Sequence, residues 1–180
     1  MKKIFCTVIS LLAAFTCHAE KPDLSKQYVD SLTGVAFNYP SSWAVRQQRT
    51  NAFQVMVANQ RGLESCMLTT GHQAELRKIT SDQFANSLKP SDVVALFKQG
   101  ESDLNIVDFK ATKIGNRPAV FYEGKSIYQS LNSRFPIQTV AVILKLDDRI
   151  FTLGCLTHES AFAEAKPTLL NILKSLTIRL

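Results

Sequence analysis

Hydrophobic and polar residues alternate along most of the chain in the pattern of β-strands. Val35, Phe37 and Tyr39 occupy every second position before Pro40, which predicts a strand over 34–40. Further strand-like stretches follow at 43–45, 52–58, 64–70, 105–114, 118–128, 137–146 and 149–156. Because short turn signals separate most neighbours, we expect the strands to pair in antiparallel fashion.

Three segments have apolar residues at helical spacing instead. The first begins at Thr80 or Ser81, the second follows at Ser91, and the third covers 159–176. We expect Pro167 to kink the third helix or to restart it. Four strands, two short helices, four strands and one long helix predict an α+β fold, a mostly antiparallel β-sheet with helices packed on its faces.

The first nineteen residues have the layout of a secretory signal peptide. Lys2 and Lys3 give a positive start, an apolar stretch follows, and Ala19 is a small residue at a plausible cleavage point. The apolar stretch is too short to span a bilayer, which needs about 20 helical residues. We therefore predict a periplasmic or secreted protein that is not an integral membrane protein. Acylation of Cys17 as a lipoprotein is the alternative, although Phe15 before it fits a lipobox poorly.

The remainder of the chain has the composition of one globular domain. Hydrophobic residues make up 46% and charged residues 20% of the chain, which is typical of a folded protein. We expect a leader over 20–33 and a single domain over 34–180. The formal charge is +6, to which the signal peptide contributes two lysines, so the mature chain carries +4. That mild excess, together with export, argues against a nucleic-acid partner.

Two cysteines, Cys66 and Cys155, remain after the signal peptide. In an oxidising compartment they most simply form one disulfide, with two buried free thiols as the alternative. His72 and His158 would complete a Cys2His2 set, but the spacing is not that of a zinc finger, so we predict no metal site. A Cys155–His158 nucleophile pair would need a free thiol.

Five basic residues lie near predicted turns. Arg46, Arg49 and Arg61 flank the second and third strands, and Arg77 and Lys78 precede the first helix. They are candidates for a docking patch that binds anionic lipid or an acidic partner. The alternative is an ordinary solvated surface of mixed charge.

Three segments resemble the PsbP-like superfamily when taken in order. They are the aromatic strand with its Pro and Trp over 37–43, the Ile-Gly-Asn-Arg-Pro-Ala stretch over 114–119, and the closing helix over 169–178. The resemblance covers roughly 35–180. It implies a PsbP-like α/β/α sandwich in which helices cover both faces of an antiparallel sheet. Relatives include an extrinsic photosystem II subunit, a nuclear Ran-binding factor and small exported bacterial proteins, and no family-wide catalytic residues carry over.

No catalytic or cofactor signature is present in the sequence. It lacks the nucleophile elbow, the P-loop and the dinucleotide-binding glycines, and Asp147-Asp148 is interpreted as a solvated hairpin turn rather than a carboxylate pair. We therefore predict no enzyme and no cofactor. The leading hypothesis is an exported, non-enzymatic binding or accessory protein of the bacterial cell envelope with an unknown protein partner. The alternative is a carrier of a small apolar or lipid-like ligand in a pocket between sheet and helices, and a third class is a hydrolase with an unrecognised site.

Overall fold

The computed structural model describes residues 23–48, 53–98, 103–130 and 133–179. The expected signal peptide lies outside this part of the chain. The strands are β1 Lys26–Val29, β2 Val35–Tyr39, β3 Ala44–Gln48, β4 Phe53–Ala58, β5 Glu64–His72, β6 Asn105–Ile114, β7 Arg117–Ser130, β8 Ser133–Leu146, β9 Arg149–His158 and β10 Thr177–Ile178. The helices are η1 Ala74–Lys78, α1 Ser81–Ser87, α2 Pro90–Lys98, η2 Glu159–Ala161 and α3 Phe162–Lys174.

Seven strands form a large sheet in the order β3-β4-β5-β9-β8-β7-β6, and β1-β2-β10 form a small one. Neighbours in both sheets run antiparallel. The chain leaves the large sheet after β5, passes through η1, α1 and α2, and re-enters at the outer strand β6. It then returns strand by strand until β9 pairs with β5. The predicted α+β fold with a mostly antiparallel sheet is confirmed.

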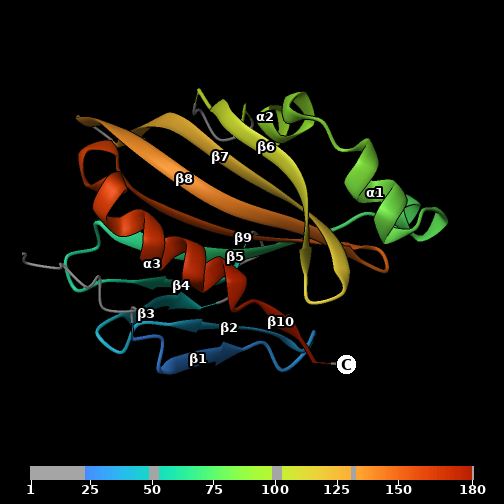
Figure 1. Ribbon diagram of the computed structural model, residues 1–180, viewed down its shortest axis with the longest axis horizontal. Helices are drawn as coiled ribbons and strands as arrows, with labels where there is room; N and C mark the ends of the chain where they lie inside the picture. Colours follow the sequence, from blue (N-terminus) through green and yellow to red (C-terminus); the bar gives the residue numbers. More distant parts are fainter. Residues whose placement is uncertain (1–22, 49–52, 99–102, 131–132, 180) are drawn as a thin grey trace, which may run out of the picture.

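Helices cover both faces of the large sheet (Figure 1). Helix α3 packs on β8 and β9 and reaches β2 of the small sheet, whereas α1 packs on β7 and β8 from the other side. Successive residues of β8 point to opposite faces of the sheet. Val142 belongs to the core beneath α3, and Ile143 belongs to the core beneath α1. This alternation is the expected result when both faces of a strand are covered.

A disulfide joins the two neighbouring strands β5 and β9. Cys66 and Cys155 are register partners, both are fully buried, and their Cα atoms are 4.0 Å apart. They are 89 residues apart in sequence, and closing a loop of that length contributes about 4 to 5 kcal/mol in the chain-entropy model. The crosslink therefore fixes the junction at which the returning half of the chain meets the first half.

Two details of the structure go beyond what the sequence indicated. The stretch treated as a leader contains β1, which pairs with β2 from Lys26↔Tyr39 to Val29↔Ala36. Helix α3 runs through Pro167 without a break, although a proline there removes one backbone hydrogen bond. Burial of Leu169, Ile172 and Leu173 on the sheet offsets that loss. No helix in the described ranges is long and apolar enough to cross a membrane.

Candidate functional site

A cleft of about 360 Å³ lies between helix α3 and the strands β6 and β7. We call it the α3 cleft. On β6 it is lined by Asp108, Lys110, Thr112 and Ile114, which occupy alternate positions and so share one face of the strand. The β6–β7 pair thus presents a wall of mixed chemistry, with the ion-paired carboxylates Asp108 and Glu123 at one end and Ile114 beside Lys113 at the other.

Helix α3 supplies the opposite wall. Lys166, Leu170, Leu173 and Lys174 line the cleft, and their spacing of four, seven and eight residues places them on one helical face. The two leucines lie between the two lysines. Together with the side chains of the sheet, they give the cleft an apolar floor with lysines around it.

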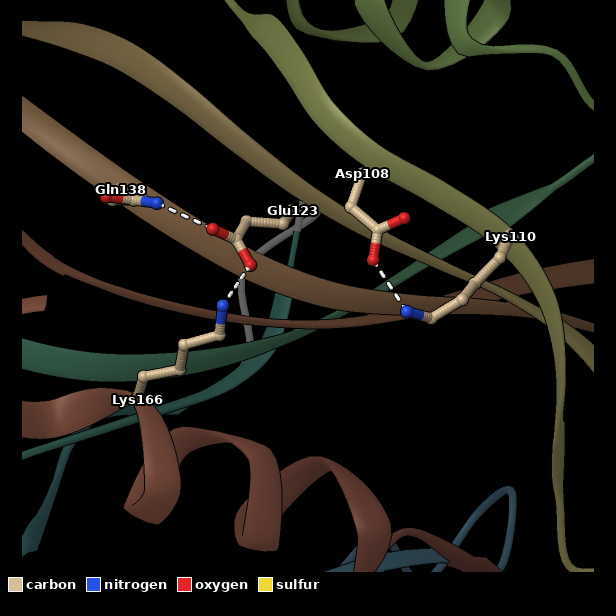
Figure 2. A network of polar contacts seen from close by, with 5 residues as sticks. All are labelled: Asp108, Lys110, Glu123, Gln138 and Lys166. Atoms are coloured by element: carbon tan, nitrogen blue, oxygen red, sulfur yellow. Dashed lines mark hydrogen bonds and ion pairs between the residues drawn. The ribbon is translucent and has the colours of Figure 1, made fainter. Parts of the chain in front are cut away.

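A buried hydrogen-bond network closes one end of the α3 cleft (Figure 2). Glu123 of β7 accepts a hydrogen bond from Gln138 Nε2 at 2.7 Å on one carboxylate oxygen. On the other oxygen it receives Lys166 Nζ at 2.6 Å. Because both oxygens have a partner, the buried carboxylate of Glu123 is compensated and ties α3 to the sheet.

A second ion pair stands beside the first in the same view (Figure 2). Asp108 is the register partner of Glu123, and like charges placed opposite each other destabilise a sheet. Lys110 Nζ lies 2.6 Å from Asp108, and the hydrogen bond it donates is the main cause that lowers the pKa of Asp108 below its usual value. Lys110 also lies over the Phe121 ring, 4.9 Å from its centroid.

The other end of the α3 cleft has cations without such partners. Lys113 and Lys174 line it, both are exposed, and neither forms an ion pair with a carboxylate of the described residues. An apolar floor beside unpaired ammonium groups suits a molecule with an apolar body and an anionic head. The cleft therefore has the chemistry of a binding site for such a molecule.

The β7–β8 hairpin forms a second distinctive surface. Strand β6 pairs with β7 only as far as Lys125, and β9 pairs with β8 only as far as Ile137, so the hairpin extends beyond both neighbours. Tyr128 and Phe135 face each other across this extension and are 55% and 44% exposed. We call residues 126–130 and 133–136 the hairpin arm. It combines an exposed aromatic pair with strand edges that no described strand covers.

The predicted basic patch is divided between two places. Arg46 donates hydrogen bonds to the carbonyls of Asn59 and Gln60, next to Arg61 at the start of β5. Arg77 and Lys78 follow the other end of β5, roughly 25 to 30 Å along the strand. The remaining member, Arg49, lies outside the described residues.

The turn at Asp147-Asp148 differs from the solvated tip expected from the sequence. Asp147 is exposed, but Asp148 is buried and is contacted by Arg77 and His72. Arg77 Nε lies 2.7 Å from Asp148 Oδ2, and this hydrogen bond is the main cause that lowers the pKa of Asp148. The turn is therefore a structural anchor for η1.

The histidines and cysteines do not converge on a metal site. His72 and His158 lie at opposite ends of the paired strands β5 and β9, while Cys66 and Cys155 form the disulfide near the middle. Within the described ranges, no group of three or more His, Cys, Asp or Glu side chains is placed to hold a metal ion.

Sequence reasoning suggested a pocket between sheet and helices as an alternative but did not identify the residues of the α3 cleft, although part of their signal was available. The spacing of Lys166, Leu170 and Lys174 marks a mixed face on the last helix. Glu123, the ion-pair partner of Lys166, is 43 residues away in sequence, and only the strand order brings these two residues together. That order depends on the return of the chain at the outer edge of the sheet, which no local pattern encodes.

Comparisons with known proteins agree with this architecture. A family model described as PsbP matches residues 24–178. No curated protein matches the chain. The solution structure of cyanobacterial PsbP (CyanoP) from Synechocystis sp. PCC 6803 is similar with a TM-score of 0.60 at 13% identity, covering 86% of this chain and 92% of that one.

A second solved structure extends the likeness to a eukaryote. The Ran-binding protein Mog1p of Saccharomyces cerevisiae has a TM-score of 0.57 at 9% identity, covering 85% of this chain and 94% of its own. At such identities the likeness concerns the fold alone. The match of the family model over nearly the whole described chain gives the assignment: this chain belongs to the PsbP family.

Proposed function

We propose that this chain is an exported, non-enzymatic binding protein of the bacterial cell envelope whose α3 cleft takes a small amphipathic molecule. The observation that carries the proposal is the combination of an apolar floor with unpaired lysines in one cleft of about 360 Å³. That volume lies in the usual range for small-molecule sites. The signal-like start of the chain supports export.

The apolar part of the ligand would lie on Phe121, Val142, Leu170 and Leu173. Removing apolar surface from water drives such binding at roughly 25 cal/mol per Å². Lys113 and Lys174 would receive the anionic head at the end away from the Glu123 network. At the other end, Lys110 and Lys166 are already paired with carboxylates and are not available to an anionic head. The ligand would therefore bind in a single orientation.

A fluorescent fatty acid tests this proposal. We would titrate the mature protein with 11-(dansylamino)undecanoic acid and follow the emission of the dansyl group. Leu170→Glu places a negative charge on the cleft floor at a half-buried position, so we expect affinity to fall at least tenfold. Leu63→Glu is the matched control, because Leu63 is exposed and lies outside the cleft.

The result has two clear readings. Loss of probe binding in Leu170→Glu with wild-type binding in Leu63→Glu supports the carrier function. Failure of the wild-type protein to bind the probe, or equal loss in both variants, contradicts it. Native mass spectrometry of protein purified gently from the periplasm would then identify the physiological ligand by mass.

The hairpin arm favours a second candidate function, that of an accessory subunit bound to an envelope protein. Aromatic side chains are enriched at protein interfaces, and a free strand edge can pair with an extended segment of a partner. Pro136 of β8 has no backbone N–H to donate to an added strand. We therefore expect a partner strand to pair with the β7 edge of the arm.

In-cell crosslinking tests the accessory role. The wild-type protein should capture one envelope complex repeatedly, and Tyr128→Ala with Phe135→Ala should lose it. Leu32→Ala, which alters an exposed leucine on the β1–β2 turn, should retain it. Capture that is equal in all three proteins would exclude the arm as the docking surface.

A further inference from the structure

A second hollow, of about 800 Å³, lies at the end of the large sheet opposite the hairpin arm. The β8–β9 turn, the start of β7, η1 and the β1–β2 turn surround it. Four cationic side chains line it: Arg77, Arg117, Lys145 and Arg149. We call it the basic cleft. It brings together Arg77, one of the five residues of the basic patch predicted from the sequence, and three cations that the sequence analysis did not single out.

Lys145 is the unusual member of the basic cleft. The residue is only 5% exposed, and it occupies the same face of β8 as Ala141 and Ile143, which pack beneath α1. No carboxylate forms an ion pair with Lys145 among the described residues. The stem of Lys145 is packed in the core, while its ammonium is not among the fully buried polar atoms and lines the hollow. An ammonium group at the wall of a hollow without a counter-charge favours an anion beside it.

The two carboxylates of the basic cleft do not supply that anion. Asp148 is already engaged by Arg77 and His72, and Asp147 is exposed on the turn. Arg117 and Arg149 also have no ion-pair partner among the described residues. Three cations thus line one hollow without an ion-pair partner among the described residues, although the exposed carboxylate of Asp147 lies in the same lining.

We propose that the basic cleft binds the phosphate group of a phosphate ester. Arginine guanidinium groups match phosphate oxygens with two parallel hydrogen bonds, and the Lys145 ammonium adds a point charge. A phosphate monoester carries close to two negative charges at neutral pH, which suits several convergent cations better than a single carboxylate does. The proposal is independent of the α3 cleft, since none of these four cations lines that cleft.

Calorimetric titration with sn-glycerol 3-phosphate tests the site, using the mature protein. We expect Lys145→Met to lower the affinity at least tenfold, because methionine keeps the length of the side chain and removes the charge. Arg149→Gln, an exposed position, serves as a second variant with little risk to folding and should also weaken binding. Arg46→Gln is the matched control, since Arg46 is an exposed residue of β3 that does not line the basic cleft.

The source of the phosphate is distinguished by vesicles. Sedimentation with phosphatidylglycerol vesicles, and with phosphatidylcholine vesicles for comparison, shows whether the cleft also takes a lipid headgroup. Binding of either phosphate probe that is lost in Lys145→Met and Arg149→Gln but kept in Arg46→Gln supports the proposal. Absence of binding to both probes, or equal weakening by Arg46→Gln, overturns it and leaves a non-specific surface charge effect.

Discussion

The α3 cleft and the basic cleft differ in how their charges are compensated. At one end of the α3 cleft, two lysines each lie 2.6 Å from a carboxylate. In the basic cleft, Lys145, Arg117 and Arg149 have no such partner among the described residues. The two clefts lie close together on the sheet, because Ile114 lines the α3 cleft and its register partner Arg117 lines the basic cleft.

The difference in ion pairing distinguishes charged residues that stabilise the fold from charged residues that we propose to bind a ligand. Lys166 holds the buried carboxylate of Glu123, so the fold depends on it. The backbone carbonyl of Lys145 accepts a hydrogen bond from Ser81, but its ammonium group forms no ion pair among the described residues, although the residue is only 5% exposed. A cation at the wall of a hollow without an ion-pair partner can accept an anionic ligand, and this is why we place the proposed phosphate site there.

The largest expected effect on stability comes from removing the disulfide of the large sheet, which contributes to both clefts. Replacing Cys66 and Cys155 together by alanine should lower the free energy of unfolding by about 4 kcal/mol, since the 89-residue loop is no longer closed. Urea unfolding of the variant and the wild-type protein measures this change. Both clefts should keep their affinities for the dansyl probe and for glycerol phosphate at temperatures well below unfolding, because the sheet is still paired. Selective loss of one affinity would show that only that cleft depends on the crosslink.

The next largest effect tests the difference between the two clefts directly, because one lysine of each cleft is replaced by methionine. Lys166→Met leaves Glu123 buried without its cation and should destabilise the protein by about 2 to 4 kcal/mol. Lys145→Met removes a charge that has no ion-pair partner and keeps the packed stem, so it should change stability by less than about 1 kcal/mol, or increase it. Thermal and urea unfolding of both variants measure the difference.

Glu123→Gln provides the control for this pair of variants. In combination with Lys166→Met it should restore part of the lost stability, because no buried charge is left unpaired. A large destabilisation by Lys145→Met would contradict our distinction, since it would reveal a structural contact for that ammonium group. Equal effects of the two lysine variants would contradict it as well.

Much of the fold follows from local sequence patterns, and the reasons are physical. Alternation at Val35, Phe37 and Tyr39 and the helical stripe through Leu169 and Leu173 predict elements that the structure contains. The short strand β1 was missed because KQYV at 26–29 is mostly exposed and has no apolar alternation. Its stability comes from pairing with β2, which is a tertiary effect.

The clefts were harder to predict than the fold. Lysine at position 145 follows the apolar run of β8, and this break in the pattern was a usable signal for a special position. Convergence of Lys145 with Arg77 depends on η1 folding back over the β8–β9 turn, which Arg77 and Asp148 hold. The buried state of Asp148 was missed for the same reason, since a two-residue turn by itself favours solvent.

The smallest expected effect is a pH dependence that belongs to Asp148. The hydrogen bond from Arg77 lowers the pKa of Asp148, so the ionised carboxylate stabilises the folded protein above the unfolded-state pKa of about 3.9. That stability is lost as the pH falls through the lower folded-state pKa. Asp148→Asn lacks this contribution, so the wild-type protein should lose more stability than the variant between pH 5 and pH 3. Urea midpoints at the two pH values measure it.

Asp108→Asn is the matched change in the α3 cleft. Its pKa is also lowered, mainly by the hydrogen bond from Lys110, but both side chains of that pair are well exposed, so its contribution to the pH dependence should be weaker. Only Asp148→Asn should also weaken glycerol phosphate binding, because Asp148 holds Arg77 at the basic cleft. Unchanged phosphate affinity in Asp148→Asn would show that Arg77 takes no part in the site, and would restrict it to the three cations without an ion-pair partner among the described residues.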